Sequence, residues 1–91
     1  MNTSVLIVDD EQEIRDSLSE VLTDEGFLTY TAENGAVALE MMEDIHYDII
    51  ISDIKMPELD GVTLLQRVKE KAPDTFVILI TSYGSTETAI H

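Results

Sequence analysis

The chain has 91 residues, enough for one domain with a modest core, since a chain of this size buries only about 60–65% of the surface that its unfolded form exposes. Apolar residues make up 44% and charged residues 26%, as in ordinary soluble proteins. Nineteen acidic residues against five Lys and Arg give a net charge of −14, which argues against direct binding to nucleic acid or to an anionic membrane, because both require basic patches. Such acidity suits a positively charged partner or a cation site, and it equally suits solubility alone.

Three further features predict a cytoplasmic location. The chain has no cysteine, so it fits a reducing compartment without disulfides. No apolar run approaches the ~20 residues that are needed to span a bilayer. Residues Met1–Ser4 lead directly into a strand-like run, without the basic and apolar segments of a signal peptide.

The first part of the chain predicts a strand, a helix and a second strand. Val5–Val8 is continuously apolar and rich in β-branched residues, as expected of a strand that is buried on both faces. Gly26 is well placed to end the following helix in a left-handed turn, and Leu28–Ala32 predicts a weaker strand beside a sheet edge. The helix is predicted from apolar residues that have the spacing of one helical face: Ile14, Leu18, Val21 and Leu22.

The middle of the chain repeats this alternation. Asn34 can cap a second helix, and Ile49–Ile51 predicts a third strand that runs into Asp53. The second helix is expected to bury Ala38, Leu39 and Met42. Asp60 is expected to cap a third helix, and Pro73 to end it. This third helix would bury Leu64, Leu65 and Val68.

The last part of the chain predicts one more strand and one more helix. Phe76–Ile80 is the fourth strand, and Ser85 or Thr86 is expected to open a fourth helix. Strands that alternate with helices imply βαβ units, a parallel sheet and right-handed crossovers. Because there is no linker, low-complexity tract or tandem repeat, we expect a single domain over residues 1–91.

Acidic residues follow two of the predicted strands at the same edge of the sheet. Asp9 and Asp10 come directly after the first strand, and Asp53 follows the third. In a doubly wound sheet these two strands are neighbours, and sites lie at the carboxyl ends of the strands, so the three carboxylates are expected to converge. Like charges this close need a cation or a shared proton, and Mg²⁺ is the expected ion because it prefers oxygen ligands.

Each acid taken singly also has a structural explanation. Asp9 or Asp10 could cap the first helix, and Asp is common in turns. However, Thr81 ends the fourth strand at the same rim, where its hydroxyl can hydrogen-bond a phosphoryl oxygen. A metal, a carboxylate nucleophile and a donor around one point favour phosphoryl transfer through an acyl phosphate.

Three motifs of this chain resemble those of the response-regulator receiver domains of two-component signalling. They are Val8-Asp9-Asp10-Glu11 after the first strand, Ser52-Asp53-Ile54-Lys55-Met56-Pro57-Glu58-Leu59-Asp60-Gly61 after the third, and Thr81-Ser82-Tyr83-Gly84 after the fourth. The resemblance covers the whole chain, and the segment from Asp53 to Gly61 is its most specific part. It implies an α/β, flavodoxin-like doubly wound parallel sheet with the strand order 2-1-3-4-5.

The resemblance also implies roles for individual residues. Asp53 would receive the phosphoryl group from the phosphohistidine of a sensor histidine kinase. Asp10 and Asp53 would bind Mg²⁺ directly, together with the backbone carbonyl of Lys55, and Asp9 would act largely through a water. Thr81 would be the switch hydroxyl that turns toward the phosphoryl group.

At the level of the whole protein, the resemblance implies signal transduction and the regulation of transcription. Residues 81–89 look most like receivers that precede sigma-54-dependent activator domains, so an effector domain would lie beyond the chain end. The domain would catalyse its own phosphorylation and dephosphorylation without turning over a separate substrate.

The sequence departs from the family at its end. The family has a fifth strand, with a lysine that contacts the phosphoryl group, and then a fifth helix, and this sequence stops before either. The expected order is therefore 2-1-3-4, and the fourth strand would lack its outer neighbour. Since a bare strand edge favours pairing, we expect the chain to be poorly stable as a monomer or to exchange elements in a homodimer.

Two other functions compete with the phosphoacceptor switch. Without the lysine, the chain could be an unphosphorylated receiver-like interaction or dimerisation module, whereas its intact carboxylates and Thr81 favour phosphorylation. A metal-dependent phosphohydrolase is disfavoured, because such enzymes generally carry an Asp-x-Asp arrangement after the first strand. His46 and His91 have no metal-binding spacing and are interpreted as incidental, and the Lys55 side chain is interpreted as solvated.

Overall fold

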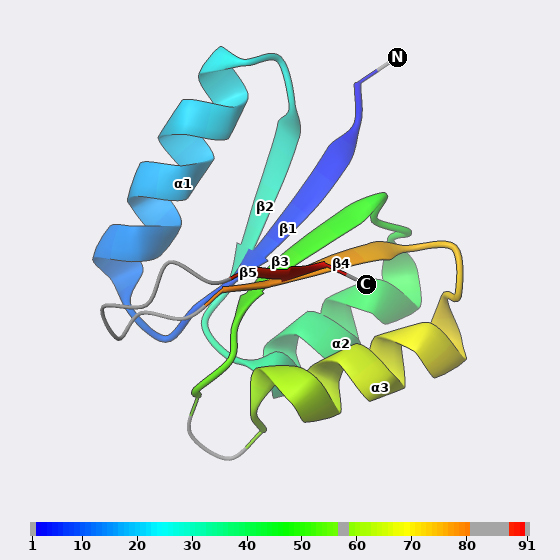
Figure 1. Cartoon of the computed structure of the whole chain (residues 1–91). Helices are drawn as coiled ribbons and strands as arrows, with labels where there is room; N and C mark the ends of the chain where they lie inside the picture. The colour runs from blue at the N-terminus through cyan, green and yellow to red at the C-terminus, as the bar shows by residue number, and fades with distance from the viewer. Residues whose placement is uncertain (1, 57–58, 81–87, 91) are drawn as a thin grey trace.

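Five strands form one sheet in the order β2-β1-β3-β4-β5. The computed structural model describes residues 2–56, 59–80 and 88–90, the last three by their backbone alone (Figure 1). Along the chain the elements are β1 (Ser4–Val8), α1 (Gln12–Asp24), β2 (Leu28–Ala32), α2 (Gly35–Asp44), β3 (Ile49–Asp53), α3 (Gly61–Lys71), β4 (Phe76–Ile80) and β5 (Thr88–Ile90). The first four strands are parallel, so the predicted α/β fold with the order 2-1-3-4 is confirmed.

The register of the parallel strands brings the residues after β1 and β3 to one edge of the sheet. Val8 lies opposite Ala32 of β2 on one side and opposite Ser52 of β3 on the other. Asp53 lies opposite Ile80, the last residue of β4. The chain therefore leaves β1 at the level where β3 reaches its last residue, which is the geometry that the predicted convergence of carboxylates requires.

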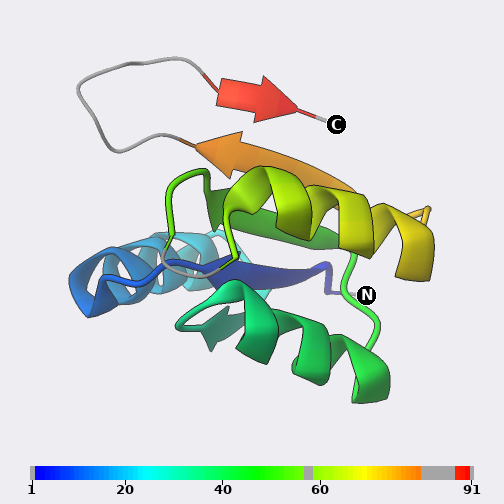
Figure 2. The same ribbon diagram turned by 90° about the horizontal axis from the view of Figure 1, so that it is seen from below.

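One face of the sheet carries the main hydrophobic core. Helices α2 and α3 cover this face, whereas α1 lies on the other one (Figures 1 and 2). The buried side chains of this core are Leu6, Val8, Ala32, Ala38, Tyr47, Ile50, Met56, Leu64, Val68, Val77 and Leu79. A fully buried Leu or Val side chain contributes about 1.5–3 kcal/mol to stability, so this cluster anchors the fold.

The opposite face is only partly covered. Val5 and Ile7 of β1 are buried there, but Ile51 and Ile78 on β3 and β4 are half-buried, and Phe76 is 45% exposed. Helix α1 is positioned over β2, because the hydroxyls of Ser19 and Thr23 hydrogen-bond that of Thr29 at 2.9 and 3.0 Å. Much of the β3–β4 half of this face therefore remains accessible.

The position of α1 also explains one wrong expectation. Val21 has the spacing of the apolar helical face, yet it is 58% exposed. Ser19 and Thr23 turn their side of the helix toward β2, and Val21 lies about half a turn away from them, on the flank that faces away from β2. Periodicity alone could not show which part of the apolar stripe meets the sheet.

The predicted helix ends are confirmed at four positions. Asn34 accepts a hydrogen bond from the backbone N–H of Val37 at 2.9 Å, and Asp60 accepts one from Thr63 at 2.8 Å. Gly26 follows α1 with φ of +98°, in the left-handed region. Helix α3 ends at Lys71, before Pro73. The predicted core residues Ala38, Leu64 and Val68 are buried, and Leu39, Met42 and Leu65 pack against the core half-buried.

The predicted fourth helix is wrong over residues 88–90. Thr88–Ile90 form β5, which pairs antiparallel with β4 and places Thr88 opposite Ile80. The segment 81–87 is too short for a parallel crossover, which takes about a dozen residues or more, so the returning chain runs antiparallel. The outer edge of β4 is thus paired over three residues and is not bare as expected. Ser85 and Thr86 lie outside the described residues.

No helix within the described ranges combines the length and the apolar character that a membrane crossing requires.

Candidate functional site

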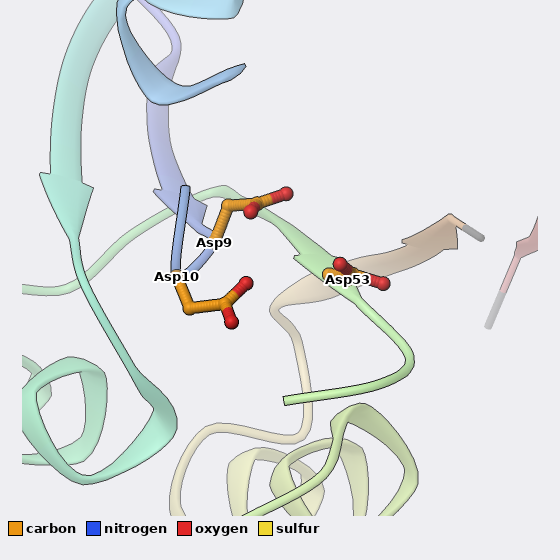
Figure 3. Close-up of side chains that lie close together, drawn as sticks. All are labelled: Asp9, Asp10 and Asp53. Atoms are coloured by element: carbon orange, nitrogen blue, oxygen red, sulfur yellow. The ribbon is translucent and has the colours of Figure 1, made fainter. Parts of the chain in front are cut away.

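Three carboxylates converge at the carboxyl end of β1 and β3. Asp9 and Asp10 follow β1 directly, and Asp53 is the last residue of β3. One carboxylate oxygen of each lies within 4.8 Å of those of the other two, and the side chains surround a common space (Figure 3). The structure thus brings together the three acidic residues that the sequence predicts for this site.

Asp9 is held in the turn that joins β1 to α1. It is only 1% exposed, its N–H donates to the carbonyl of Ala32 at 3.2 Å, and its Oδ1 accepts the N–H of Glu11 at 2.9 Å. The N-cap position of α1 is Glu11, whose side chain makes no capping hydrogen bond. Neither Asp9 nor Asp10 is the N-cap residue, so the expectation that one of them caps this helix is wrong.

Asp53 is also buried, at 4% exposure. The backbone N–H of Lys55 donates to its Oδ1 at 3.2 Å. The start of α3 lies close to the end of β3, because the N–H of Gly61 donates to the carbonyl of Ile54 at 2.8 Å. A Cβ atom at Gly61 would collide with the Asp53 carbonyl oxygen and would lie 2.9 Å from the Ile54 Cα, so this approach requires glycine.

The acidic surroundings of Asp9 oppose its ionisation. Burial raises the pKa of Asp9, the negative charges of Asp53, Asp10 and Glu11 raise it further, and the hydrogen bond from the Glu11 N–H opposes them. A cation bound among these oxygens would favour the ionised form. Clustered oxygen donors of this kind, with one exposed carboxylate at the solvent side, fit a hydrated Mg²⁺ ion.

The remaining predicted site residues have different outcomes. Lys55 is exposed, and its backbone lies beside Asp53 through the hydrogen bond just described. Thr81, together with Tyr83, lies outside the described residues. The roles of Lys55 and Thr81 therefore stay predictions.

Two contacts near the ends of the sheet escaped the sequence analysis. An Arg15 guanidinium nitrogen donates to the backbone oxygen of Asp9 at 2.7 Å. The only signal for it in the sequence is a basic residue in the turn that follows the acid pair. At the other end of the sheet, a His46 ring nitrogen lies 3.2 Å from an Asp74 carboxylate oxygen in an exposed pair. Its partner is 28 residues away, which no local pattern could indicate.

Comparison with known proteins identifies the family of this chain. The profile of the response regulator receiver domain matches residues 5–91. The chain belongs to the response-regulator receiver family. Receiver domains of two-component response regulators act as phosphoryl acceptors in signal transduction.

Individual relatives agree with this assignment. The receiver is 44% identical over 86 residues to regulatory protein AtoC of Escherichia coli, covering 94% of this chain and 19% of that protein. It is 39% identical over 87 residues to sporulation initiation phosphotransferase F of Bacillus subtilis, covering 96% of this chain and 70% of that one. The chain thus spans about a fifth of AtoC, whose remaining length is outside the comparison.

A solved structure resembles the receiver both in fold and in sequence. The response regulator TrrA of Thermotoga maritima, in complex with Mg²⁺ and BeF, has a TM-score of 0.84 and 40% identity. The match covers 90% of this chain and 71% of that one. Receiver domains bind Mg²⁺ at an acidic pocket, and in this chain Asp9, Asp10 and Asp53 form an acidic cluster.

Proposed function

We propose that this receiver is phosphorylated on Asp53, and that a sensor histidine kinase donates the phosphoryl group. The observation that carries the proposal is the cluster in which Asp53 shares one space with Asp9 and Asp10 at the carboxyl end of the sheet. Asp53 is the member of the cluster that ends the central strand β3. It is also the residue for which the resemblance to the receiver motifs implies the acceptor role. Its burial keeps the reacting carboxylate largely away from bulk water.

In the proposed reaction, an Asp53 carboxylate oxygen attacks the phosphorus atom of phosphohistidine. The new O–P bond forms as the P–N bond breaks, and the electron pair of that bond returns to the imidazole nitrogen, which takes up a proton. The product is an aspartyl phosphate, and catalysis consists mainly of positioning and charge neutralisation. Bound Mg²⁺ would supply that neutralisation between the phosphoryl oxygens and the carboxylates.

We assign the metal ligands to Asp10, Asp53 and the backbone carbonyl of Lys55, with Asp9 acting through a water. The hydrogen bonding of Asp9 supports this division, because one of its oxygens already accepts the Glu11 N–H. Asp10 is exposed, and no hydrogen bond among the described residues engages its carboxylate, so it is available to an ion. Mg²⁺ commonly keeps several waters and takes one or two carboxylates from the protein, in agreement with this set.

The proposed consequence of phosphorylation is a change in partner contacts. The Thr81 hydroxyl would turn toward the phosphoryl group, and the surface beyond β4 would rearrange. An effector domain would respond to this rearranged surface. Similarity to regulatory protein AtoC supports a transcriptional output. We place these events in the cytoplasm, the compartment that the composition predicts.

We also propose that the receiver associates into a homodimer. The half-covered face of the sheet supports this proposal, since Ile51, Ile78 and Phe76 remain partly accessible there. The net charge of −14 opposes association, so the dimer should strengthen as salt screens the repulsion. Light scattering on a size-exclusion column at low and high salt measures this, and a monomer under both conditions contradicts it.

The phosphoacceptor proposal is tested by intact mass after incubation with Mg²⁺ and acetyl phosphate. The parent chain should gain the mass of one phosphoryl group, and Asp53→Ala should gain none. Asp48→Asn is the matched control, because it removes an acid from the opposite end of β3 and should be phosphorylated like the parent. Hydroxylamine, which cleaves acyl phosphates, should remove the added group.

Each result points to one interpretation. Gain in the parent and in Asp48→Asn, but not in Asp53→Ala, establishes Asp53 as the acceptor. Equal gain in all three moves the acceptor to another residue. No gain in any of them, with folded protein and Mg²⁺ present, overturns the proposal and favours the receiver-like interaction module.

A further inference from the structure

Arg15 is a basic residue of α1 whose side chain reaches the backbone of the site. It lies in the first turns of α1, is half-buried, and donates from its guanidinium to the backbone oxygen of Asp9 at 2.7 Å. We infer that Arg15 is a positioning residue that fixes the β1–α1 turn, so that Asp10 faces the metal. This inference rests on the proposed function, because it concerns how the same site obtains its affinity for Mg²⁺.

The bonds of this turn show why it needs such an anchor. Asp9, the residue before Asp10, donates its N–H to the backbone oxygen of Ala32 and accepts the Arg15 guanidinium at its own backbone oxygen. The residue after it, Glu11, is held at its N–H by the Asp9 carboxylate. Among the described residues no hydrogen bond involves the Asp10 carboxylate itself, so the backbone on either side sets its direction. Without Arg15, one of these three restraints is lost.

The other basic side chains with known contacts serve different parts of the fold. Lys71 pairs with Glu43 at 3.8 Å, and Lys69 donates to the backbone oxygen of Thr75. Arg67 lines an open groove of about 320 Å³ between α2 and α3. All three belong to α3, on the opposite face of the sheet from α1. Arg67 therefore provides a control that removes the same charge without touching the turn.

Arginine also has the shape that this contact needs. Its planar guanidinium presents its N–H donors in a rigid fork, so one nitrogen can bind a backbone oxygen in a fixed direction. A lysine ammonium is a compact point charge on a flexible stem. Groups that orient metal ligands from behind typically change metal affinity by about 10–100-fold when they are removed. Because Arg15 acts on a backbone oxygen and not on a ligand atom, we expect the lower end of that range.

The test measures Mg²⁺ binding by isothermal titration calorimetry, without a phosphodonor, for the parent, Arg15→Gln, Arg15→Lys and Arg67→Gln. Arg15→Gln should bind Mg²⁺ about tenfold more weakly than Arg67→Gln, which carries the same net charge. Arg15→Lys should fall between them. Thermal melts by circular dichroism establish that each variant is folded at the temperature of the titration.

A second readout separates positioning from direct contact with the phosphoryl group. The rate of phosphorylation by acetyl phosphate is followed against Mg²⁺ concentration. If Arg15 positions Asp10, Arg15→Gln needs about tenfold more Mg²⁺ for half-maximal rate but reaches nearly the parent rate at saturation. A rate that stays low at saturating Mg²⁺ means that the guanidinium touches the reacting group, and this overturns the positioning role.

The outcomes also distinguish this inference from the proposed function. If the parent binds Mg²⁺ and is phosphorylated, while Arg15→Gln and Arg67→Gln bind the ion equally, the inference fails and the proposed function stands. If the parent itself does not bind Mg²⁺, both fail. Weakened binding in Arg15→Gln but not in Arg67→Gln, with partial recovery in Arg15→Lys and a nearly parental phosphorylation rate at saturating Mg²⁺, supports the inference.

Discussion

Aspartates lie at both ends of the sheet, but their surroundings shift the carboxyl pKa in opposite directions. At the amino end, Asp48 accepts hydrogen bonds from the N–H and the hydroxyl of Ser4 at 2.9 and 3.1 Å, and Asp74 pairs with His46. These contacts lower the pKa of both carboxyl groups, because they favour the charged form. At the carboxyl end, burial and neighbouring acids raise the pKa of Asp9.

This difference separates acids whose contacts favour their charged form from the acids of the proposed metal site. The amino-end pairs join loops that are distant in sequence, and their charges are satisfied and exposed. At the carboxyl end, the buried Asp9 and Asp53 lie beside each other and beside the exposed Asp10, an arrangement that opposes folding until a cation joins them. Changes matched between the two ends should therefore differ in size or in sign.

The largest effect is expected from Gly61→Ala at the carboxyl end. The added Cβ meets the backbone of Asp53 and Ile54, which cannot move aside as a flexible side chain would. We expect a loss of about 2–3 kcal/mol in unfolding free energy, measured by urea denaturation, together with weaker Mg²⁺ binding.

Gly26→Ala is the matched change at the amino end. Gly26 has φ of +98°, but no atom lies within 4 Å of the position that an added Cβ would take, so only backbone strain of about 1 kcal/mol is added. Mg²⁺ affinity should not change. Equal losses of stability and of Mg²⁺ affinity in the two variants would contradict the special role of the close approach at Gly61.

Asp9→Asn should have the next largest effect, and in the opposite direction. Asparagine can still accept the Glu11 N–H but removes a buried negative charge, so unfolding free energy without Mg²⁺ should rise by about 1–2 kcal/mol at neutral pH. Urea denaturation with and without Mg²⁺ measures this. The ion should stabilise the parent more than the variant, and a destabilised Asp9→Asn protein would contradict the prediction.

The pH dependence of this effect follows from the raised pKa of Asp9. Because the folded state binds this proton more tightly than the unfolded state, the contribution to stability is present below the ordinary carboxyl pKa. It is lost as the pH rises through the raised pKa of the folded state. The excess unfolding free energy of Asp9→Asn over the parent should therefore increase as the pH rises from acid to neutral.

Asp48→Asn is expected to have a smaller effect of the opposite sign. The Ser4 contacts lower the pKa of Asp48, so its contribution to stability is present above the ordinary carboxyl pKa and is lost as the pH falls through the lowered one. The variant should be slightly less stable than the parent near neutral pH and equal to it in acid. A series of urea melts across this range checks the convergence of the two curves.

Tyr47→Phe should have the smallest effect. Tyr47 is fully buried where the chain enters β3, and its hydroxyl has no hydrogen-bond partner among the described residues. Its ring packs edge-on against Tyr30 with centroids 5.2 Å apart, which phenylalanine preserves. We expect thermal stability within about 0.5 kcal/mol of the parent or slightly above it. A loss beyond about 1 kcal/mol would show that the hydroxyl has a partner such as a buried water.

Features that depend on neighbours in sequence were predictable. Asn34 and Asp60 cap helices because a side-chain oxygen three residues ahead of a backbone N–H forms a local contact. The apolar strands predicted the parallel sheet, and the sheet placed Asp9 and Asp53 at one edge. The candidate site was therefore largely readable from the spacing of strands and acids.

Features that depend on distant segments were not predictable in this way. The exposure of Val21 depends on where α1 sits on the sheet, and the antiparallel direction of β5 depends on how the chain returns to β4. Both contradicted a local pattern. The pairing of His46 with Asp74 likewise requires two loops to meet at one end of the sheet.

By itself, the sequence determined the order of the elements from β1 to β4, the core that α2 and α3 cover, and the three acids that cluster at the sheet edge, because hydrophobic periodicity and strand ends are local properties. The tertiary structure decided which of the acids are buried, which backbone atoms hold them, and that Arg15 reaches the carbonyl of Asp9. Burial and hydrogen-bond partners arise only when separate segments pack. These quantities, in turn, set the charge balance on which metal binding depends.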